Sequence, residues 1–510
     1  MTEQTAAIAD APVAHTAQGA LGGMRAASGL ESYFGIPYAA PPVGALRFRP
    51  PQPPATWQGE RDATKPGAVA PQEQPATYAL PHTDEDCLFL NIWTPGRQGR
   101  RPVLFYIHGG AFISGSGSSP NYDGSRMAEE NDVVVVTINY RLGVLGFPPF
   151  HVFGPETPGN LGLLDQAAAL EWVRDNIATF GGDPDNVTIY GYSAGGWCVA
   201  ALMAMPQARG LFHRAAPQSG AFMYAMTPEA QDVHARTFLA ALELETPDAA
   251  MLQALPISEL LRAQATVIAA WQTRVMADQT EELNFPFTPT RDGITLRGHP
   301  IAAIKRGDCV SVPVLVGSTQ DELGAAPFRL ALEWMRAIMC GPSIRAAIAK
   351  LSSSRKANAI WDGYAALHPT SSDATLAGFA RSDWQYRVPA IRVAEAGPQF
   401  GSRTWMYRFE LGAAAPRIGG VATHATDTRF WFGTMAGSTY QDFFFERAPP
   451  PAELDLSRQM RADLAQFARS GTCHWPAYES GRRGTMCYAE TSSVIADPAG
   501  AERALWDGVV

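Results

Sequence analysis

Short runs of apolar, often β-branched residues recur along the chain from about residue 100 onward, and stretches of helical periodicity separate them. Runs of this kind, bounded by Gly, Pro or Asn, are typical of strands buried on both faces of a parallel sheet. They predict strands at 102–108, 132–139, 187–191, 312–317 and 404–409. Because strands and helices alternate, we expect an α/β fold in which helices cover a mostly parallel central sheet.

Two helical regions stand out in this pattern. Leu164, Trp172 and Ile177 recur at helical spacing within 161–180, which predicts the helix of a crossover between two parallel strands. A second region, around 325–400, is helical and irregular and lies between two predicted strands. We expect it to form a cap or a wall over a pocket, or else to be a merely structural insertion.

The first hundred residues differ from the rest of the chain. They are rich in proline, as in 41–44 and 49–54, which favours extended chain and short edge strands over helices. The sequence contains no linker long enough to separate independent domains. We therefore predict an N-terminal segment over 1–23, flexible at its start, followed by a single domain over 24–510.

The composition excludes several classes of protein. The 510 residues carry a net charge of −9 and no cluster of Lys and Arg, so we expect no nucleic acid partner. No apolar run reaches the roughly 18 to 20 residues of a membrane helix, and the N-terminus lacks the basic and apolar regions of a secretion signal. We expect a soluble cytoplasmic protein, a monomer or a small homo-oligomer, that binds no membrane.

Cysteine and lysine usage refine this expectation. The six cysteines show no CxxC spacing, which predicts reduced thiols and neither a disulfide scaffold nor a zinc site. The chain has 36 Arg against 4 Lys and is rich in Ala, which suggests a GC-rich bacterial genome.

One short motif indicates nucleophilic chemistry. The sequence GYSAG at Gly191–Gly195 follows a predicted strand and precedes the helical stretch 197–205. A G-x-S-x-G motif between a strand and a helix holds its serine on a sharp turn, with the hydroxyl exposed. We therefore interpret Ser193 as a nucleophile, the alternative being a serine in an ordinary tight turn.

A serine nucleophile needs N–H groups that bind the developing oxyanion. The sequence HGGAF at 108–112 ends a predicted strand, and its glycines leave N–H groups free to face a ligand oxygen. Gly109, Gly110 and Ala194 are the candidate donors. We interpret His108 as a structural part of this loop, because it precedes the nucleophile.

A base, and an acid that orients it, must follow the nucleophile along the chain in a protein of this kind. Asp321 and Glu322 come directly after one predicted strand and compete for the role of the acid, which spacing alone does not decide. His424 comes after the next strand and its loop. It is the best candidate for the base.

Two longer stretches carry a family resemblance. EDCLFLNIWTP at Glu85–Pro95 and the segment from Phe180 to Gly195 resemble the two signatures of the type-B carboxylesterase family, the carboxylesterase, lipase and cholinesterase group of α/β-hydrolases. Further similar stretches lie at 34–51, 139–147 and 159–166, so the resemblance covers nearly the whole chain. It implies an α/β-hydrolase fold with helical cap or wall excursions, and a serine esterase without metal or cofactor.

The resemblance also assigns roles to single positions. The catalytic residues that it implies are Ser193 as nucleophile, His424 as base, and Glu322 rather than Asp321 as acid. The oxyanion donors that it implies are Gly109, Gly110 and Ala194. Ser219, in the sequence QSG, is implied to hydrogen-bond polar groups near these residues, unless it is simply a serine at the end of a strand.

The sequence departs from the family pattern at three positions. Tyr192 stands where an acidic residue usually precedes the nucleophile, so specificity for cationic, cholinesterase-type substrates is not expected. Cys87 is the first cysteine of the chain, so the disulfide that many members form with an upstream cysteine cannot form. Leu323 replaces a common glycine, which we interpret as local loop variation.

Aromatic residues flank the motifs and predict a pocket for neutral, apolar groups, unless their rings belong to the core. The candidates are Phe112, Tyr192, Trp197 and Phe430. We expect a carboxylesterase that cleaves neutral esters of small to medium size through an acyl-enzyme. A lipase, or an amide, carbamate or lactone hydrolase, would use the same residues. A non-catalytic binding or adhesion protein is a remote alternative, because serine, glutamate and histidine are all present.

Overall fold

The computed structural model describes most of the chain, namely residues 11–73, 82–149, 157–221, 225–245, 248–277, 285–323, 341–412, 421–435 and 448–509. The start of the N-terminal segment, 1–10, where flexibility was expected, lies outside the described residues. Residues 11–23 carry two short strands of a small three-stranded sheet, which consists of β1 (Val13–His15), β2 (Ala20–Gly22) and β5 (Glu60–Asp62).

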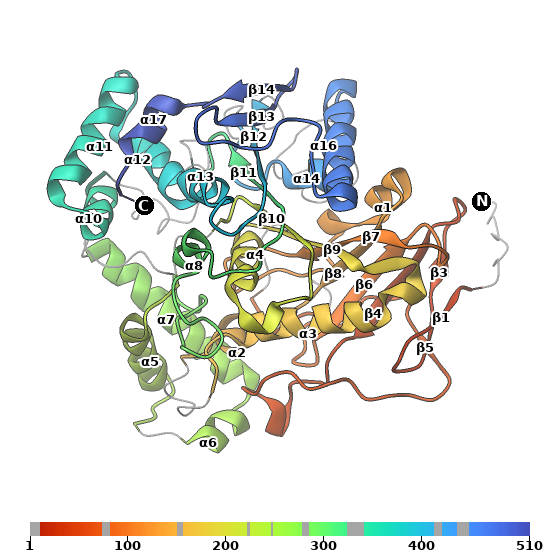
Figure 1. Ribbon diagram of the computed structural model, residues 1–510. Helices are drawn as coiled ribbons and strands as arrows, with labels where there is room; N and C mark the ends of the chain where they lie inside the picture. The colour runs from red at the N-terminus through yellow and green to blue at the C-terminus, as the bar shows by residue number, and fades with distance from the viewer. Residues whose placement is uncertain are drawn as a thin grey trace.

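A larger sheet of eleven strands forms the centre of the described chain (Figure 1). In spatial order its strands are β14 (Ser493–Ala496), β13 (Gly484–Tyr488), β12 (Thr404–Phe409), β11 (Val314–Thr319), β10 (Arg214–Gln218), β9 (Gly182–Tyr192), β7 (Arg101–Ile107), β8 (Val134–Ile138), β6 (Phe89–Thr94), β4 (Glu31–Pro37) and β3 (Met24–Arg25). The strands from β8 to β13 pair in parallel, and the strands at both edges pair antiparallel.

This sheet confirms the mostly parallel α/β fold. Each of the five predicted strands corresponds to an observed one, and 404–409 has the same bounds in both. Strand β10 was not predicted. Its sequence RAAPQ contains no β-branched residue and includes a proline, so nothing in its composition marks it as a strand.

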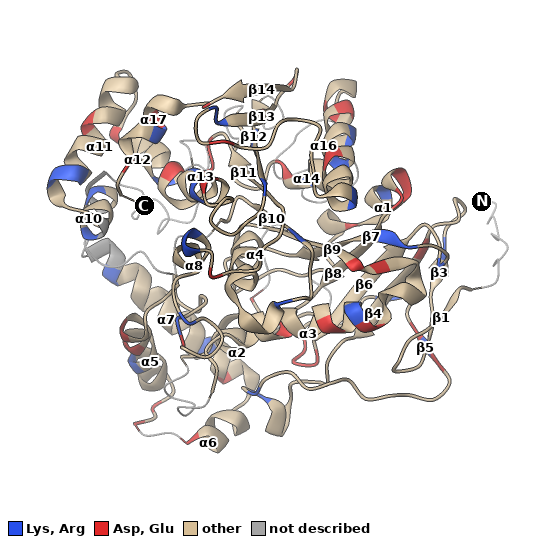
Figure 2. Ribbon diagram, in the orientation of Figure 1, with Lys and Arg blue, Asp and Glu red and all other residues tan. Residues whose placement is uncertain are grey.

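Helices surround the sheet, and the predicted crossover helix is present as α3. The helices are α1 (Ser125–Asn131), α2 (Gly143–Gly146), α3 (Leu161–Asn176), α4 (Ala194–Ala204), α5 (Pro228–Ala241), α6 (Ala249–Ala254), α7 (Ile257–Ala277), α8 (Pro300–Arg306), α10 (Gly341–Leu351), α11 (Ser354–Leu367), α12 (Asp373–Ser382), α13 (Val388–Glu395), α14 (Thr428–Phe432), α16 (Pro451–Ser470) and α17 (Gly500–Leu505). Figure 2 shows Lys and Arg interspersed with Asp and Glu over them. No helix of the described part is both long and apolar enough to cross a membrane.

The sheet separates two hydrophobic cores because side chains alternate along each strand. On β7, Val103 and Phe105 face the core that includes residues of α3 and α4, whereas Leu104 and Tyr106 face the core that includes residues of α16. All four side chains are completely buried. Burial of a large apolar side chain stabilises the fold by about 1.5–3 kcal/mol, so the two cores hold the strands, and the loops after them, in fixed positions.

A third core lies within the helical excursion predicted around 325–400. It joins α10, α11 and α12 to Trp271 of α7, and Figure 1 shows these helices beside α17 at one side of the sheet. Leu323 is part of this core and is 7% exposed. The excursion therefore packs directly against the loop that follows β11.

Candidate active site

The candidate residues lie at one edge of the sheet. Since the carboxyl ends of parallel strands meet at the same edge, loops far apart in sequence come together there. Gly109 and Gly110 follow β7, Ser193 follows β9, Ser219 follows β10, Glu322 follows β11, and His424 lies in the segment after β12.

Ser193 lies on a strained turn between β9 and α4. Its φ of 56° and ψ of −126° are rare for a residue with a side chain and cost about 1–3 kcal/mol. Two hydrogen bonds hold this turn: the N–H of Ser193 donates to the carbonyl of Gln218 over 3.0 Å, and its carbonyl accepts from the N–H of Trp197 over 2.9 Å. The serine is thereby fixed at the tip of the turn.

The glycines of the motif are required by close approach of the backbone. A Cβ atom on Gly195 would lie 2.0 Å from the carbonyl oxygen of Ile107, and one on Gly191 would lie 2.5 Å from the same oxygen. Only glycine fits at these two positions, because β7, β9 and α4 meet there. The sequence pattern thus has a steric origin in the packing around Ser193.

His424 connects Ser193 to Glu322. Its Nε2 atom lies 2.8 Å from Oγ of Ser193, and its Nδ1 atom lies 2.5 Å from Oε2 of Glu322. The other carboxylate oxygen of Glu322 accepts from the N–H of Thr319 over 2.8 Å, and the side chain of Glu322 is 1% exposed. This pairing orients the imidazole with Nδ1 toward the carboxylate and Nε2 toward the hydroxyl.

The backbone joins the loops that carry these residues. The N–H of His424 donates to the carbonyl of Glu322, and the N–H of Asp321 donates to the carbonyl of Ala422, each over 3.0 Å. The two loops therefore form one unit, and the distance between the imidazole and the carboxylate does not depend on side chains alone.

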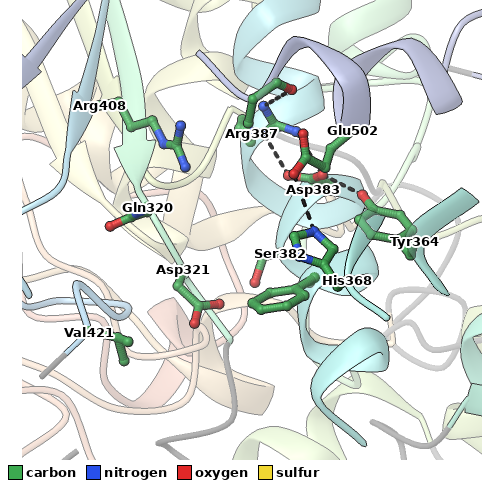
Figure 3. A pocket seen from close by; sticks show the side chains of 12 residues that line it. Gln320, Asp321, Tyr364, His368, Ser382, Asp383, Arg387, Arg408, Val421 and Glu502 are labelled. Carbon is green, nitrogen blue, oxygen red and sulfur yellow. Dashed lines mark hydrogen bonds and ion pairs between the residues drawn. The ribbon is translucent and has the colours of Figure 1, made fainter. Parts of the chain in front are cut away.

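Asp321, the competing candidate for the acid, does not reach His424. Its Oδ1 atom is buried and finds no hydrogen-bond partner among the described residues. Burial, with the charges of Asp383 and Glu322, raises its pKa to about 7. Asp321 lines a separate cavity of about 300 Å³, shown in Figure 3, whose opposite wall contains Asp383.

The loop after β7 turns sharply beside Ser193. Gly110 has a φ of +122°, and a Cβ atom there would lie 2.0 Å from the carbonyl oxygen of Ser114. A Cβ atom on Gly109 would lie 3.0 Å from the Cβ of Ser193, so this part of the loop lies directly beside the serine. Ala194 is the first residue of α4, where N–H groups precede the first intrahelical hydrogen bonds.

His108 supports this loop from within the core. Its ring stacks on Tyr140 at 4.5 Å between centroids, and its Nδ1 atom lies 2.8 Å from the carbonyl oxygen of Gly109. Burial lowers the pKa of His108 to about 4, so the ring is neutral at ordinary pH and donates its Nδ1 proton to that carbonyl. It does not face Ser193 as His424 does.

The candidate pocket residues divide into two groups. Phe112 and Trp197 lie 5.6 Å apart between ring centroids, and the ring of Tyr192 lies 5.2 Å from that of His424. Phe430 lies elsewhere: it is completely buried in the core that includes residues of α16, where its ring packs 4.9 Å from that of Phe409. For Phe430 the structure therefore shows the alternative left open for these rings, a place in the core.

Ser219 lies next to the turn of Ser193, but its side chain makes none of the expected hydrogen bonds within the described part of the chain. Its N–H donates to the carbonyl of Gly317 over 2.9 Å, and a Cβ atom on Gly220 would lie 2.2 Å from the carbonyl oxygen of Ser193. The Oγ atom of Ser219 is buried and finds no partner among the described residues.

Two residues near His424 were not found from the sequence. The ring of Tyr386 lies 4.9 Å from the imidazole of His424. Asp427 is buried, accepts from Nε1 of Trp431 over 3.1 Å, and has a pKa raised to about 6 by burial and by the charge of Glu322. Its position three residues after His424 was the available signal, whereas nothing in the sequence marks Tyr386.

A strand, a sharp turn carrying Ser193 and a helix, set in a mostly parallel sheet, define the α/β-hydrolase fold. Among the described residues, no three His, Cys, Asp or Glu side chains gather closely enough to hold a metal ion. The chain matches the model of the carboxylesterase family over residues 10–494. The protein belongs to this family and is a carboxylic ester hydrolase.

Known proteins resemble the chain over most of its length. A para-nitrobenzyl esterase of Bacillus subtilis (strain 168) is 36% identical over 490 residues, which cover 93% of this chain and 94% of that protein. A liver carboxylesterase of Sus scrofa is 32% identical, covering 98% of this chain and 94% of that one. The solved structure of a thermophilic PNB esterase superposes with a TM-score of 0.84 at 33% identity, over 97% of this chain and 99% of that one.

Proposed function

We propose that the protein hydrolyses neutral carboxylic esters of small to medium size through an acyl-enzyme on Ser193. The observation that carries this proposal is the continuous hydrogen-bonded chain from Ser193 through His424 to Glu322. Serine hydroxyls are weak nucleophiles, and a neutral imidazole held by a carboxylate is the base that activates them.

In the first step, Nε2 of His424 takes the proton of Ser193 while Oγ attacks the ester carbonyl carbon. The carbonyl oxygen becomes an oxyanion, which accepts from the N–H groups of Gly109, Gly110 and Ala194. The imidazolium, stabilised by the charge of Glu322, then gives its proton to the leaving alcohol oxygen as the bond between acyl carbon and alcohol oxygen breaks. The acyl group stays on Oγ.

In the second step, water takes the place of the alcohol. It gives a proton to Nε2 of His424 and attacks the acyl carbon, and the same N–H groups stabilise the second oxyanion. The carboxylic acid leaves as Oγ of Ser193 regains its proton from His424. Both steps use only groups of the protein and water, so the reaction needs no cofactor.

The substrate preference rests on the rings beside the serine. Trp197 is partly exposed and packs against the buried ring of Phe112, and Tyr192, next to Ser193, brings no charge. Neutral acyl or alcohol groups gain from this contact, whereas a cation finds no carboxylate at the position of Tyr192. The names of the relatives, a para-nitrobenzyl esterase and a liver carboxylesterase, agree with a carboxylic ester as substrate.

We further propose that residues 24–510 act as one domain, as a monomer or small homo-oligomer, in a bacterial cytoplasm. The cysteines of the described residues support a reducing compartment: Cys87, Cys198, Cys309, Cys473 and Cys487 are all free.

The function is tested by hydrolysis of p-nitrophenyl esters from acetate to laurate, with the native protein, Ser193→Ala and the control Ser352→Ala. Ser352 is exposed and lies beyond the end of α10. We expect Ser193→Ala to lower kcat about a million-fold and Ser352→Ala to leave it unchanged. A folded native protein that cleaves none of these esters contradicts the proposal. A rate that jumps above the solubility limit of the longer esters indicates a lipase instead.

A further inference from the structure

His424 contacts two tyrosine rings besides its hydrogen-bond partners. The ring of Tyr386 lies 4.9 Å from the imidazole between centroids at an angle of 48°, and the ring of Tyr192 lies 5.2 Å away at 44°. Both distances are within the range of favourable aromatic contacts, about 4.5–7 Å. Tyr192 is fixed by its position next to Ser193, whereas Tyr386 comes from the helical excursion.

Tyr386 lies in an unusual element, the π-helical turn η7 (Asp383–Arg387) between α12 and α13. Such turns insert one residue into a helix, redirect the side chains that follow, and occur often at functional sites. The turn is held on the side of the cavity in Figure 3, where Arg387 donates to both carboxylate oxygens of Asp383 and to the carbonyls of Pro498 and Ala499.

The same turn is tied to the loop that carries Glu322. Ser382, the last residue of α12, accepts from the N–H of Leu323 over 2.8 Å, and its hydroxyl donates to the carbonyl of Gly378. Leu323 directly follows Glu322, whose carboxylate holds Nδ1 of His424. The contacts therefore form a closed series. It runs from His424 to Glu322, through Leu323 and Ser382, and back to His424 through Tyr386.

We propose that Tyr386 is a positioning residue: its ring, held by the π-helical turn, keeps the imidazole of His424 aligned between Glu322 and Ser193 and stabilises its charged form. This inference rests on the role proposed for His424. The excursion around 325–400 then contributes a side chain that contacts the base directly.

The chemistry of the ring explains both parts of this role. A bulky ring against the imidazole restricts its rotation, so that Nε2 stays at hydrogen-bond distance from Ser193. The face of a tyrosine ring also attracts a cation, and His424 becomes an imidazolium in each transition state. Among the described residues, the titratable groups around His424 and Tyr386 are Glu322 on the loop after β11, Asp427 and Tyr192 beside His424, and Arg381 on α12.

The hydroxyl of Tyr386 is not needed for this role. Burial, with the negative charge of Glu322 nearby, raises its pKa, so the hydroxyl stays protonated and cannot act as a base at ordinary pH. The ring alone carries the effect. Phenylalanine at this position therefore keeps the effect of the ring on His424. Leucine, which is apolar but not aromatic, removes that effect.

The test compares Tyr386→Phe and Tyr386→Leu with the control Tyr478→Leu, by steady-state kinetics on p-nitrophenyl butyrate from pH 5 to 9. Tyr478 lies outside the candidate active site, is 8% exposed, and accepts a hydrogen bond from Arg483 through its hydroxyl. We expect Tyr386→Phe to keep kcat within about twofold. Tyr386→Leu lowers kcat by about 3- to 30-fold with little change in KM, and moves the acidic limb of kcat/KM to lower pH, because the imidazolium loses a stabilising contact.

Three results overturn the proposal. The first is an unchanged kcat in Tyr386→Leu. The second is a rise in KM alone, which makes Tyr386 a wall of the substrate pocket. The third is a loss of kcat, equal to that of Tyr478→Leu, without any shift of the acidic limb. If Tyr386→Leu does not fold, as judged by circular dichroism, Tyr386→Met is measured in its place. Activity that survives in Ser193→Ala would overturn the proposed function itself, independently of these variants.

Discussion

The Nε2 atom of His424 lies 2.8 Å from Oγ of Ser193, although 231 positions separate the two residues along the chain. Ser193 follows β9 and His424 lies beyond β12, and only β10 and β11 stand between these strands in the sheet. Because both sheet faces are covered by cores of buried side chains, the sheet fixes this distance. Loop substitutions that displace Ser193 by a fraction of an ångström are therefore expected to reduce catalysis without unfolding the protein.

Gly109→Ala is such a substitution. The new Cβ atom would lie 2.7 Å from the carbonyl oxygen of Tyr192 and 3.0 Å from the Cβ of Ser193, so the loop must move away from the serine. We expect kcat on p-nitrophenyl butyrate to fall about 100- to 1000-fold, the usual effect of losing one oxyanion donor. Gly298→Ala is the matched control, since a Cβ atom there meets nothing within 4 Å.

A loss of activity in Gly109→Ala counts only if its thermal unfolding midpoint stays close to that of Gly298→Ala. Equal kcat values for the two variants would show that the loop after β7 does not bind the oxyanion.

Asp321 makes the stability of the fold depend on pH. Its pKa is raised to about 7 in the folded protein from an ordinary value of 3.8, so between these pH values the folded chain keeps a proton that the unfolded chain has lost. The contribution of Asp321 to stability therefore falls as pH rises from about 4 to 7. Asp321→Asn cannot ionise, and we expect it to be more stable than the native protein by about 2–4 kcal/mol at pH 8 and equally stable at pH 4.

This prediction is measured as the thermal unfolding midpoint across pH 4 to 8, with Asp362→Asn on the exposed face of α11 as the control. A midpoint of Asp321→Asn that follows the native protein at every pH contradicts the buried, protonated state of Asp321.

The roles of His108 and His424 are distinguished by replacing each of them with phenylalanine. His108→Phe keeps a ring stacked on Tyr140 and removes only the hydrogen bond to Gly109, so we expect kcat to fall by about tenfold or less. Because the pKa of His108 is about 4, the acidic limb of kcat/KM above pH 5 should stay where it is. His424→Phe removes the base and should abolish turnover.

The kcat values of the two variants, together with the pH–rate profile of His108→Phe, decide between the histidines. Turnover that survives in His424→Phe and disappears in His108→Phe would exchange the roles assigned to them.

Much of the fold was predictable because many of its strands consist of consecutive apolar residues. Strands buried on both faces need no alternation, so the runs at 102–108 and 404–409 stand out from the sequence alone. Strand β10 could not be found in this way, because RAAPQ derives its position from pairing with β9 and β11 rather than from its own composition.

The candidate site was predictable where local geometry restricts the residue types. The close approach of backbones at Gly191 and Gly195 leaves a motif around Ser193 that can be recognised in the sequence. Asp321 and Glu322 could not be separated by spacing, because only the course of the loop decides which side chain faces His424. Phe430 shows the same limit, since its proximity to His424 in sequence does not decide whether its ring lines a pocket or packs in the core.

Tyr386 was missed for a different reason. Its contact with His424 depends on a π-helical turn and on the hydrogen bond between Leu323 and Ser382, and neither leaves a periodic pattern in the sequence. Contacts between side chains on separate elements follow from the tertiary structure and are therefore visible only there.

Titration with diethyl p-nitrophenyl phosphate shows whether Ser193 is the nucleophile. This reagent phosphorylates an activated serine and releases p-nitrophenol. We expect that one equivalent of p-nitrophenol is released per protein chain, that esterase activity disappears in parallel, and that peptide mass mapping places the phosphoryl group on Ser193. Full esterase activity after stoichiometric labelling, or a label on any other residue accompanied by loss of activity, would contradict this role of Ser193.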